Sequence, residues 1–480
     1  MMQTQAQTKK VDVIYLINSI LLVVLMIGIG RLEPIGVITP LGMKIIGVFV
    51  GMLYGWLFVD LIWPSLLGLV VLGTTGYGAM NQVFMQGFGN NVVLTIILFF
   101  IFGAYLESTG LSNTIASWLL KRKFIAGKPW VFILMVFFTA YALAVLINMY
   151  AAIIILWGIL YPIFEKLGYE RGSNFVAFML SGVANIVVLG FLTTPWSPAA
   201  IQGFGGLQIG AGIEMNVFKY VVFSIILSLV TLVLYVAAAR FVFKLDLEPL
   251  KNGDFTEVLE DIVITKKQVT AIIVLIVLLL FLFLPSFLPN PFIKQFGVVG
   301  SIALMLAILC AVKIDGEPLL DLPKLARKGV SWDIVCLMAA TIPICSALSA
   351  EQAGVVQQLE ITLVPMLNQL PEAQFYIICF VAAGILTQFM HNSVLMGALI
   401  PVACKIAVLI DANPTLIAIG LLFALSTAMS TPGASSRSGI VFGNTGWISR
   451  GEAFKSGLYV LAVTLAALIV VGIPLGMVML

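Results

Sequence analysis

Two long apolar stretches are each broken by a short polar segment, LTTPWSP at residues 192–198 and STPGASSRSG at residues 430–439. Backbone that leaves the helical conformation survives in hydrocarbon only where protein or a water-filled cavity satisfies its polar groups. Paired interruptions at corresponding places in two halves of a membrane protein point to the substrate site of a transporter. The two segments therefore predict discontinuous helices that line the path of a solute.

The composition around these segments is that of a membrane protein. Apolar residues make up 61% of the chain and charged residues 10%, whereas a soluble domain carries about 25% charged residues. Apolar runs of about 20 residues, the length that spans a bilayer, recur along the chain. The net charge of +3 does not indicate nucleic-acid binding. No catalytic constellation or cofactor motif is visible, so neither an enzyme nor a bound cofactor is predicted.

Clusters of Lys and Arg orient the predicted spans, because cytoplasmic loops carry an excess of both residues. With Lys9 and Lys10 inside, residues 1–30 are predicted to form a retained first transmembrane helix, and most of the 25 Lys and Arg fall on the cytoplasmic side. Two further apolar blocks are too long for one span and are predicted as re-entrant hairpins. The predicted fold is an all-α polytopic membrane protein with about 11 transmembrane helices plus two re-entrant hairpins. A bacterial-type cytoplasmic (inner) membrane is the predicted location, with the N-terminus inside.

Two halves of the chain resemble each other. The number of residues from Glu107 to Glu351 equals the number from Asn148 to Asn392, so the two Glu and the two Asn occupy equivalent positions in the two halves. Five predicted spans separate equivalent elements, and because that number is odd the halves are predicted to be inverted repeats. The predicted organisation is repeat 1 at residues 43–243, with a hairpin at 129–164 and a broken helix at 175–211, a cytoplasmic linker at 244–267, and repeat 2 at 268–480, with a hairpin at 375–410 and a broken helix at 415–448.

Glycines mark two further features. A Gly follows three residues after Glu107 and after Glu351, which predicts the end of a helix and a structural rather than proton-carrying role for each glutamate. The glycine-rich run at residues 203–206 is predicted to form an external turn.

The order of these elements resembles a known family. A span, a hairpin with Asn near its tip and a span interrupted by Thr-Pro are followed by GIVFGNTG at residues 439–446 and GEAFKSG at residues 451–457. This pattern is similar to the divalent anion:sodium symporter family of the ion-transporter superfamily, over most of the chain and best in about the last hundred residues. The resemblance implies a homodimer with a scaffold domain and an elevator-like transport domain. It also implies dicarboxylates, citrate or sulfate as substrates, and hairpin tips whose Ser-Asn-Thr motifs help to bind sodium and substrate carboxylates.

Both hairpin tips depart from the family pattern. The first reads Ile147-Asn148-Met149 and the second His391-Asn392-Ser393. Sodium prefers hard oxygen ligands, and the side chains of Ile and Met supply none. Sodium coupling and sodium-independent exchange or proton coupling are therefore both open at this point.

Arg437 is the leading candidate for substrate binding. It is the only Lys or Arg that the predicted topology places deep within a span, where an Arg costs at least about 2.5 kcal/mol. Its planar guanidinium suits two-point binding of a carboxylate or sulfate. The alternative is an Arg that snorkels to the cytoplasmic face or pairs with an internal Glu. The other predicted substrate-binding residues are polar groups at the tips and breaks: Asn148, Thr194, Asn392, Ser393, Thr431, Ser435 and Ser436.

His391, the only histidine, is a candidate for charge and coupling because imidazole titrates near neutral pH. The alternative is a structural histidine. Asn148 and Asn392 could likewise serve only to cap the hairpin helices. A sodium ion, where one is used, is predicted near Asn392, Ser393 and Thr431.

The predicted function is secondary active transport of small polyvalent anions, di- or tricarboxylates with sulfate as a further candidate. Elevator-type alternating access is expected, as a sodium-coupled symporter or a sodium-independent exchanger. The expected partners are a small anionic substrate, the lipid bilayer and a second copy in a homodimer. The alternative is a membrane subunit of a multi-component ion- or energy-coupling complex. Such subunits carry several charged residues at mid-membrane depth, and here only Arg437 is predicted to be that deep.

Overall fold

Nearly all of the described chain is helical. The structure is a computed structural model that describes residues 13–110, 127–146, 149–252, 265–287, 291–314, 317–367 and 369–480. Within these ranges ten helices are long and apolar enough to cross a membrane, and the strands are one short antiparallel pair, Lys313–Ile314 (β1) and Glu317–Pro318 (β2). The predicted class, an all-α polytopic membrane protein, is confirmed, whereas the details of the repeats stay a prediction.

The chain divides into two compact units, Met1–Gly89 with Trp332–Leu363 and Asn90–Ser331 with Val364–Leu480. In the first unit α2 packs against α1 and α3, and α16 packs against α3 and α4. α17 (Val355–Leu367) begins in this unit. The other helices of the first unit are α1 (Val13–Gly28), η1 (Ile29–Arg31), α2 (Pro40–Phe58), α3 (Ile62–Thr74), α4 (Met80–Phe88), α16 (Trp332–Ser349) and η4 (Glu351–Ala353).

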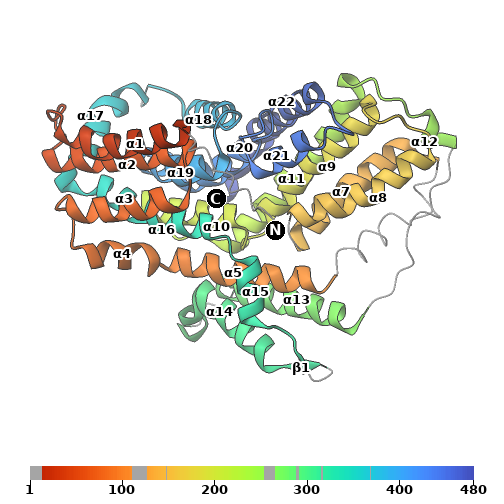
Figure 1. The fold of residues 1–480 in the computed structure, drawn as a ribbon, viewed down its shortest axis with the longest axis horizontal. Coiled ribbons are helices and arrows are strands. Elements are labelled where there is room, and N and C mark those ends of the chain that lie inside the picture. Colours follow the sequence, from red (N-terminus) through yellow and green to blue (C-terminus); the bar gives the residue numbers. More distant parts are fainter. Residues whose placement is uncertain are drawn as a thin grey trace, which may run out of the picture. The chain divides into compact units, whose positions relative to one another are not determined.

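The second unit contains the ranges predicted for both hairpins and both broken helices (Figure 1). α7 packs against α8 and α9, and α19 packs against α10 and α20. The helices of this unit are α5 (Asn91–Ser108), α7 (Pro129–Leu146), α8 (Met149–Lys166), α9 (Asn174–Thr193), α10 (Pro198–Ala211), α11 (Val217–Val242), α12 (Glu248–Asn252), α13 (Lys266–Phe287), α14 (Pro291–Ala311), α15 (Leu322–Gly329), α18 (Glu372–Leu386), α19 (Asn392–Leu409), α20 (Pro414–Leu425), α21 (Ser436–Gly443), α22 (Arg450–Ala467), η5 (Leu468–Gly472) and α23 (Ile473–Met479).

The first break separates α9 from α10 and follows from local sequence. Pro195 has no N–H and disfavours the helical conformation of the residue before it, and Thr194 is accordingly extended, with φ −82° and ψ 118°. α10 then begins with Ser197 as its N-cap, whose hydroxyl accepts a hydrogen bond from the Ala200 N–H. Pro198 occupies the first turn, where the missing N–H costs nothing. The break is therefore a short, capped turn between two helices.

A face of small residues on α10 packs closely against α19 and α20. A Cβ added at Gly210 would lie 2.2 Å from the carbonyl oxygen of Pro401, and one at Gly206 would lie 2.6 Å from the Ile400 side chain. Small residues allow such close approach between helices in membranes. The predicted external turn at residues 203–206 is wrong: these residues are helical, and their glycines serve packing rather than chain reversal.

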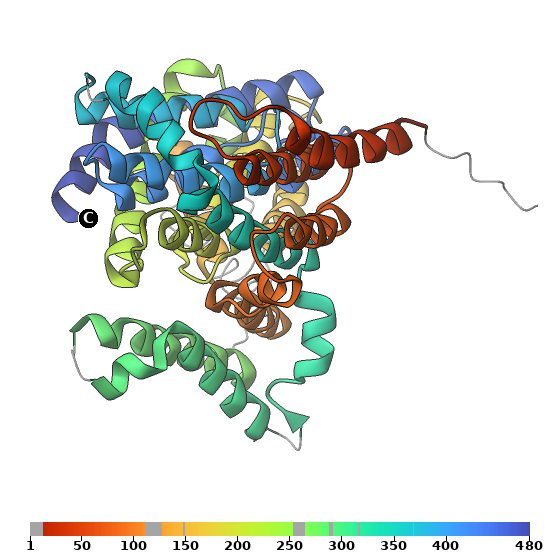
Figure 2. The ribbon, with the colours of Figure 1, turned by 90° about the vertical axis from the view of Figure 1, so that its left-hand side faces the viewer.

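One packing relation occurs twice. In the first unit α4 packs on α16, where a Cβ at Gly87 would lie 2.2 Å from the Ala339 carbonyl oxygen. In the second unit α15 packs on α5, where a Cβ at Gly329 would lie 2.5 Å from the Cβ of Ala104. In the first unit α3 also packs against α16, and in the second unit α14 also packs against α5. α14 is paired with α13 (Figure 2). The group of α3 and α4 thus includes α16 from the second half of the sequence, and the group of α13, α14 and α15 includes α5 from the first half.

The helices that carry Glu107 and Glu351 also end alike. Gly110 follows α5 with φ +67°, and Gly354 follows α16 and the short η4 with φ +70°. Glycine adopts this left-handed conformation without steric cost. The ends that the sequence predicted for these two helices are therefore present in the structure.

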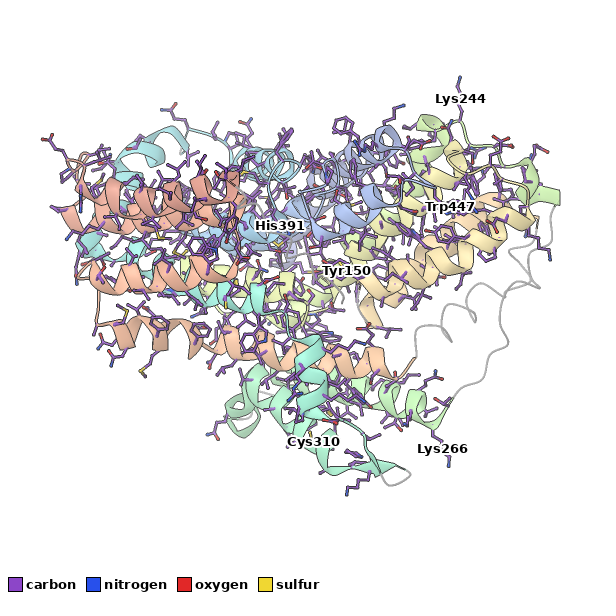
Figure 3. The ribbon with its side chains drawn as sticks, viewed as in Figure 1. Tyr150, Lys244, Lys266, Cys310, His391 and Trp447 are labelled. Carbon is purple, nitrogen blue, oxygen red and sulfur yellow. The ribbon has the colours of Figure 1, made fainter. Side chains whose placement is uncertain are left out.

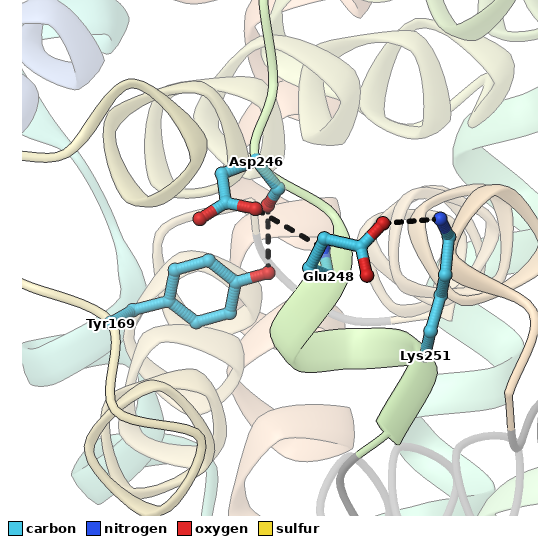
Figure 4. A network of polar contacts seen from close by, with 4 residues as sticks. All are labelled: Tyr169, Asp246, Glu248 and Lys251. Atoms are coloured by element: carbon cyan, nitrogen blue, oxygen red, sulfur yellow. Dashed lines mark hydrogen bonds and ion pairs between the residues drawn. The ribbon is translucent and has the colours of Figure 1, made fainter.

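A polar network joins the α8–α9 connection to the segment after α11 (Figure 4). The Tyr169 hydroxyl donates to the Asp246 carbonyl oxygen at 2.8 Å. The Asp246 carboxylate accepts from the Glu248 N–H at 3.1 Å, and Glu248 pairs with Lys251. Burial, with the charge of Asp246, raises the pKa of Tyr169, so the phenol remains a donor. This network anchors the start of the predicted cytoplasmic linker.

Candidate functional site

The second break, residues 426–435, is longer than the first and is held by hydroxyl groups. Ser435 is the N-cap of α21: its Oγ accepts from the Ser438 N–H at 3.1 Å and donates to the Ala428 carbonyl oxygen at 2.7 Å. The Ser438 hydroxyl donates to the carbonyl oxygen of Thr431. Side chains of α21 therefore satisfy backbone groups that the interrupted helix would otherwise leave unpaired.

A buried amide, Gln388, ties the end of α18 to this break. Its Oε1 accepts from the N–H groups of Met429 at 3.2 Å and Ser430 at 3.0 Å. Its Nε2 donates to the Thr427 carbonyl oxygen at 3.1 Å. In return, the Thr431 hydroxyl donates to the Gln388 carbonyl oxygen at 2.6 Å. The amide thus fixes the backbone of the unwound segment at several points.

Arg437 lies at the start of α21 and is 2% exposed. Its Nη2 donates to the Ser426 carbonyl oxygen at 2.8 Å, and its Nε contacts the sulfur of Met429 at 3.1 Å. Its Nη1 is buried and has no hydrogen-bond partner among the described residues. No carboxylate in the described ranges forms an ion pair with it. The guanidinium therefore keeps one donor group and its full charge unpaired inside the protein.

A second unpaired group lies in the same break. The Ser430 hydroxyl is buried and has no hydrogen-bond partner within the described parts of the chain. α22 packs closely against the backbone at Ser430. A Cβ added at Gly457 would lie 2.6 Å from the Ser430 nitrogen and 2.7 Å from the Met429 carbonyl carbon. Buried polar groups are normally hydrogen-bonded, so unpaired groups on Arg437 and Ser430 indicate a binding site.

The second hairpin tip joins the break through backbone. The Asn392 N–H donates to the Ala434 carbonyl oxygen at 3.0 Å. His391 is the N-cap of α19, and its Nδ1 accepts from the Ser393 N–H at 3.3 Å. The Ser393 hydroxyl lies 3.5 Å from Oδ1 of Asn392. The tip with His391, Asn392 and Ser393 therefore adjoins the second break at Ala434, next to the start of α21. The other predicted residues lie along the break and at the start of α21: Thr431, Ser435, Ser436 and Arg437.

The first hairpin contacts the end of α21. The Tyr161 hydroxyl, on α8, accepts a hydrogen bond from Nδ2 of Asn444, just after α21, at 3.0 Å. Asn148, the predicted residue at this tip, lies outside the described residues, so its pairing with Asn392 stays a prediction.

The first break differs from the second because its polar groups are paired. The Thr194 hydroxyl donates to the Phe191 carbonyl oxygen at 2.7 Å, and the Thr193 hydroxyl donates to the Leu189 carbonyl oxygen at 2.9 Å. Tyr220 donates to the carbonyl oxygen of Leu192. The hydroxyl of Thr194, predicted as a substrate ligand, thus satisfies backbone freed by the break. Its predicted role at the substrate remains a proposal.

Two residues of this site were missed by sequence reasoning. Gln388 was detectable as an amide within an apolar hairpin, because such a group is buried only when it is paired. Ser430 carried no signal beyond its position in the polar segment. Among the described residues no group of three or more His, Cys, Asp or Glu could hold a metal ion.

These features define a class of protein before any comparison. A polytopic helical membrane protein with a buried, unpaired guanidinium at a helix break has features that are typical of a membrane transporter. Comparison with family models narrows the class: the model described as "Citrate transporter" (CitMHS) matches residues 52–316, more than half of the chain. The chain belongs to this family of the ion-transporter superfamily, and the predicted superfamily is confirmed.

A solved structure has the same fold. It is described as the Alcanivorax borkumensis YdaH transporter with an unusual topology, and it matches with a TM-score of 0.62 over 97% of this chain and 98% of that chain. The two sequences are 16% identical, so this likeness concerns the fold alone. No curated protein matches the sequence. The family match ends at residue 316, whereas the resemblance seen in the sequence is best in about the last hundred residues.

Proposed function

We propose that the protein moves small polyvalent carboxylate anions across the membrane by alternating access. The observation that carries this proposal is the buried guanidinium of Arg437, which keeps Nη1 unpaired and has no acidic partner among the described residues. A carboxylate would supply both the missing acceptor and the missing charge. The family description, a citrate transporter, supports di- and tricarboxylates as the substrate class.

The surroundings of Arg437 favour an anion over a cation. The Ser430 hydroxyl lies in the second break, and Ser436 is the first residue of α21. The N-terminal end of α21 adjoins the break, so the helix dipole adds positive potential there. The Coulomb repulsion of a buried guanidinium would oppose a cationic substrate. A second carboxylate would find the amide and hydroxyl of Asn392 and Ser393 at the adjoining tip.

Elevator motion, homodimer formation and ion coupling are the finer parts of the proposal. All described site residues belong to the second unit, as expected when one domain carries the substrate. Sodium near Asn392, Ser393 and Thr431 would give a symporter, and the missing oxygen ligands at Ile147 and Met149 favour a sodium-independent exchanger. The distribution of Lys and Arg supports an N-terminus on the inside, and an inner-membrane location is part of the proposal.

Uptake into proteoliposomes tests the proposal. Labelled citrate, succinate and sulfate are offered with or without a sodium gradient, and with or without citrate inside the vesicles. We expect saturable uptake of at least one polycarboxylate. Dependence on sodium would identify a symporter, and dependence on internal anion an exchanger. Absence of uptake of every polyvalent anion under all these conditions would refute the proposed substrate class.

Arg437→Lys tests the residue behind the proposal. It keeps the charge but removes the planar two-point donor, so we expect at least about a 10-fold rise in the half-saturating substrate concentration, as for a lost charge-assisted hydrogen bond. Arg450→Lys is the matched control, because Arg450 is exposed at the start of α22. Unchanged half-saturation in Arg437→Lys would remove this side chain from the substrate site.

A further inference from the structure

A short basic helix, α15, connects two apolar helices of the chain. The apolar part of α14 ends at Ala311, and α16, a candidate membrane span, begins at Trp332. α15 has 8 residues, with the sequence LPKLARKG, and at 1.5 Å per residue it is only about 12 Å long. A helix of this length does not cross the hydrocarbon core of a bilayer. α15 therefore lies where the chain reaches the boundary between membrane and water.

α15 packs on the last turns of α5, another candidate membrane span, and runs across it (Figure 1). A Cβ added at Gly329 would lie 2.5 Å from the Ala104 Cβ and 3.1 Å from the Phe100 carbonyl oxygen. α5 ends at Ser108, about 6 Å beyond Ala104 along the helix. α15 thus crosses the end of a span, which is the place of a helix that lies in the plane of the membrane surface.

The two faces of α15 differ in polarity. One face is apolar and half-buried at Leu325, Ala326 and Gly329. The opposite face is exposed and basic, and it consists of Lys324, Arg327 and Lys328. A helix with one apolar and one basic face is typical of the interface between a membrane and water.

Two more cations lie near the same end of α5. Nε2 of Gln268, in the first turn of α13, donates to the carbonyl oxygen of Gly110, just after α5, at 3.1 Å. This contact brings the start of α13 to the end of α5. Lys266 and Lys267 begin α13 and are exposed, and Figure 3 shows the Lys266 side chain pointing away from the helices. We call these exposed cations around the end of α5 the basic rim: Lys266, Lys267, Lys324, Arg327 and Lys328.

Few acidic groups offset the basic rim. Among the described residues next to it in α5, α13 and α15, the carboxylates are those of Glu107 and Asp321. The Asp321 carboxylate is the N-cap of α15 and accepts the Lys324 N–H at 3.1 Å. Within the described ranges no ion pair involves a cation of the rim. The rim therefore presents positive charge at the membrane boundary.

We propose that the basic rim binds the headgroups of anionic phospholipids in the adjoining leaflet. Lys and Arg beside an anionic membrane surface are attracted to it. Leu322, on the apolar face of α15, is 37% exposed and would contact the acyl chains below those headgroups. A soluble phosphate would use the cations but would leave this apolar contact unmade, so the surface fits a lipid better.

Lipid binding to the full-length protein in a neutral detergent tests this inference. Dioleoyl phosphatidylglycerol or dioleoyl phosphatidylcholine is titrated in, and the bound lipid is counted by mass spectrometry of the intact protein. We expect the wild type to bind phosphatidylglycerol at least about 10-fold more tightly than phosphatidylcholine. Replacing three cations together, as Lys324→Gln, Arg327→Gln and Lys328→Gln, should weaken phosphatidylglycerol binding by at least about 10-fold, because each contributes to the attraction.

A charge-conserving variant is the matched control. Lys324→Arg, Arg327→Lys and Lys328→Arg together change the same three side chains and keep their charge, so we expect wild-type affinity for phosphatidylglycerol. Soluble glycerol phosphate carries the phosphate group without acyl chains, and we expect it not to displace the bound lipid at equal concentration.

Three results would overturn the inference. These are equal affinity of the wild type for both lipids, unchanged phosphatidylglycerol affinity in the neutral triple variant, and displacement of the lipid by glycerol phosphate at equal concentration, which would indicate a site for free phosphate. If the triple variant is not recovered as a folded protein, Lys324→Gln and Arg327→Gln decide singly, each with an expected loss of about threefold. The measurement is lipid binding, so a failure to transport anions would refute the proposed function and leave this inference standing.

Discussion

Arg437 is energetically unusual because its burial is only partly compensated. One hydrogen bond, to the Ser426 carbonyl oxygen, and one contact with Met429 replace the water around its guanidinium. Removing a charged group from water costs several kcal/mol in a protein, by order of magnitude, unless a partner is present. The protein without substrate therefore carries a destabilising charge that substrate binding would offset.

Arg437→Met separates function from stability. Methionine keeps an apolar chain of similar length and removes the buried charge, so we expect uptake to be lost while the melting temperature in detergent does not fall. Citrate should raise the melting temperature of the wild type by mass action but not that of the variant. A clear fall in the melting temperature of Arg437→Met would show that this side chain chiefly holds the break together.

His391 is placed as a helix cap, and this bears on its predicted role in coupling. Its Nδ1 accepts the Ser393 N–H, and a protonated imidazole has no acceptor. Positive charge at a helix N-terminus is also unfavourable. The geometry therefore fits the neutral side chain better than a fixed cation.

His391→Asn tests this placement, because Asn is a strong N-cap. We expect its uptake to show the wild-type dependence on pH between about 6 and 8, the range in which histidine titrates. His391→Ala should lose about 1 kcal/mol of stability with the cap. A changed pH profile in His391→Asn at unchanged stability would instead assign His391 to coupling.

The residues of the site differ in how well the sequence alone predicts their role. Arg437 was predicted because a cation in an apolar stretch has a cost that only a special role explains. Gln388 could be recognised as a buried amide but not assigned a partner, since an amide in a membrane helix has many uses. Its role depends on which backbone folds against it, and tertiary structure decides that.

The two breaks have different roles as elements, although similar sequences predict them. In the first, hydroxyls of Thr193 and Thr194 pair with carbonyls of α9. In the second, Gln388 and Ser435 pair with the unwound backbone and leave groups on Ser430 and Arg437 unpaired. The first break is satisfied by its own protein, whereas the second keeps buried groups unpaired, which the anion of the proposed function would pair.

Gly457→Ala tests how tightly α22 holds the second break. The added Cβ would lie 2.6 Å from the Ser430 nitrogen, closer than packed atoms allow, so the backbone beside Ser430 must shift. We expect uptake to fall at least about 10-fold and stability to fall by about 1–3 kcal/mol, as for other overpacked sites.

Gly451→Ala is the matched control on the same helix. No atom lies within 4 Å of its added Cβ, and replacing Gly by Ala in a helix is neutral or slightly stabilising. Wild-type uptake by Gly457→Ala would show that the break can move without consequence, and would weaken the assignment of Ser430 to the site.

At the scale of the whole molecule, long elements were predictable and short ones were not. Apolar length indicated the hairpin ranges, and Pro with neighbouring polar residues indicated the breaks. α4 and α15 have 9 and 8 residues, too few to span a membrane, and they were not predicted. Their positions depend on Gly87 and Gly329, whose close contacts are with residues distant in sequence.

The repeated packing of α4 on α16 and α15 on α5 supports an internal repeat, and labelling can test whether its halves are inverted. Glu107 and Glu351 are exposed at equivalent helix ends, and inversion requires them to lie on opposite faces of the membrane. Before labelling, the five native cysteines are replaced, and single cysteines are then introduced as Glu107→Cys and Glu351→Cys. An impermeant thiol reagent added to intact cells should modify the Glu351→Cys protein and spare the Glu107→Cys protein.

Opening the membrane should expose the second cysteine. Glu165→Cys serves as the control, because Glu165 is exposed at the end of α8 and is predicted to share the cytoplasmic face with Glu107. Labelling of Glu107→Cys and Glu351→Cys from the same side would show that the halves run in parallel. In that case the packing relation that occurs twice would reflect a parallel repeat, and alternating access could not arise from exchange of two inverted halves.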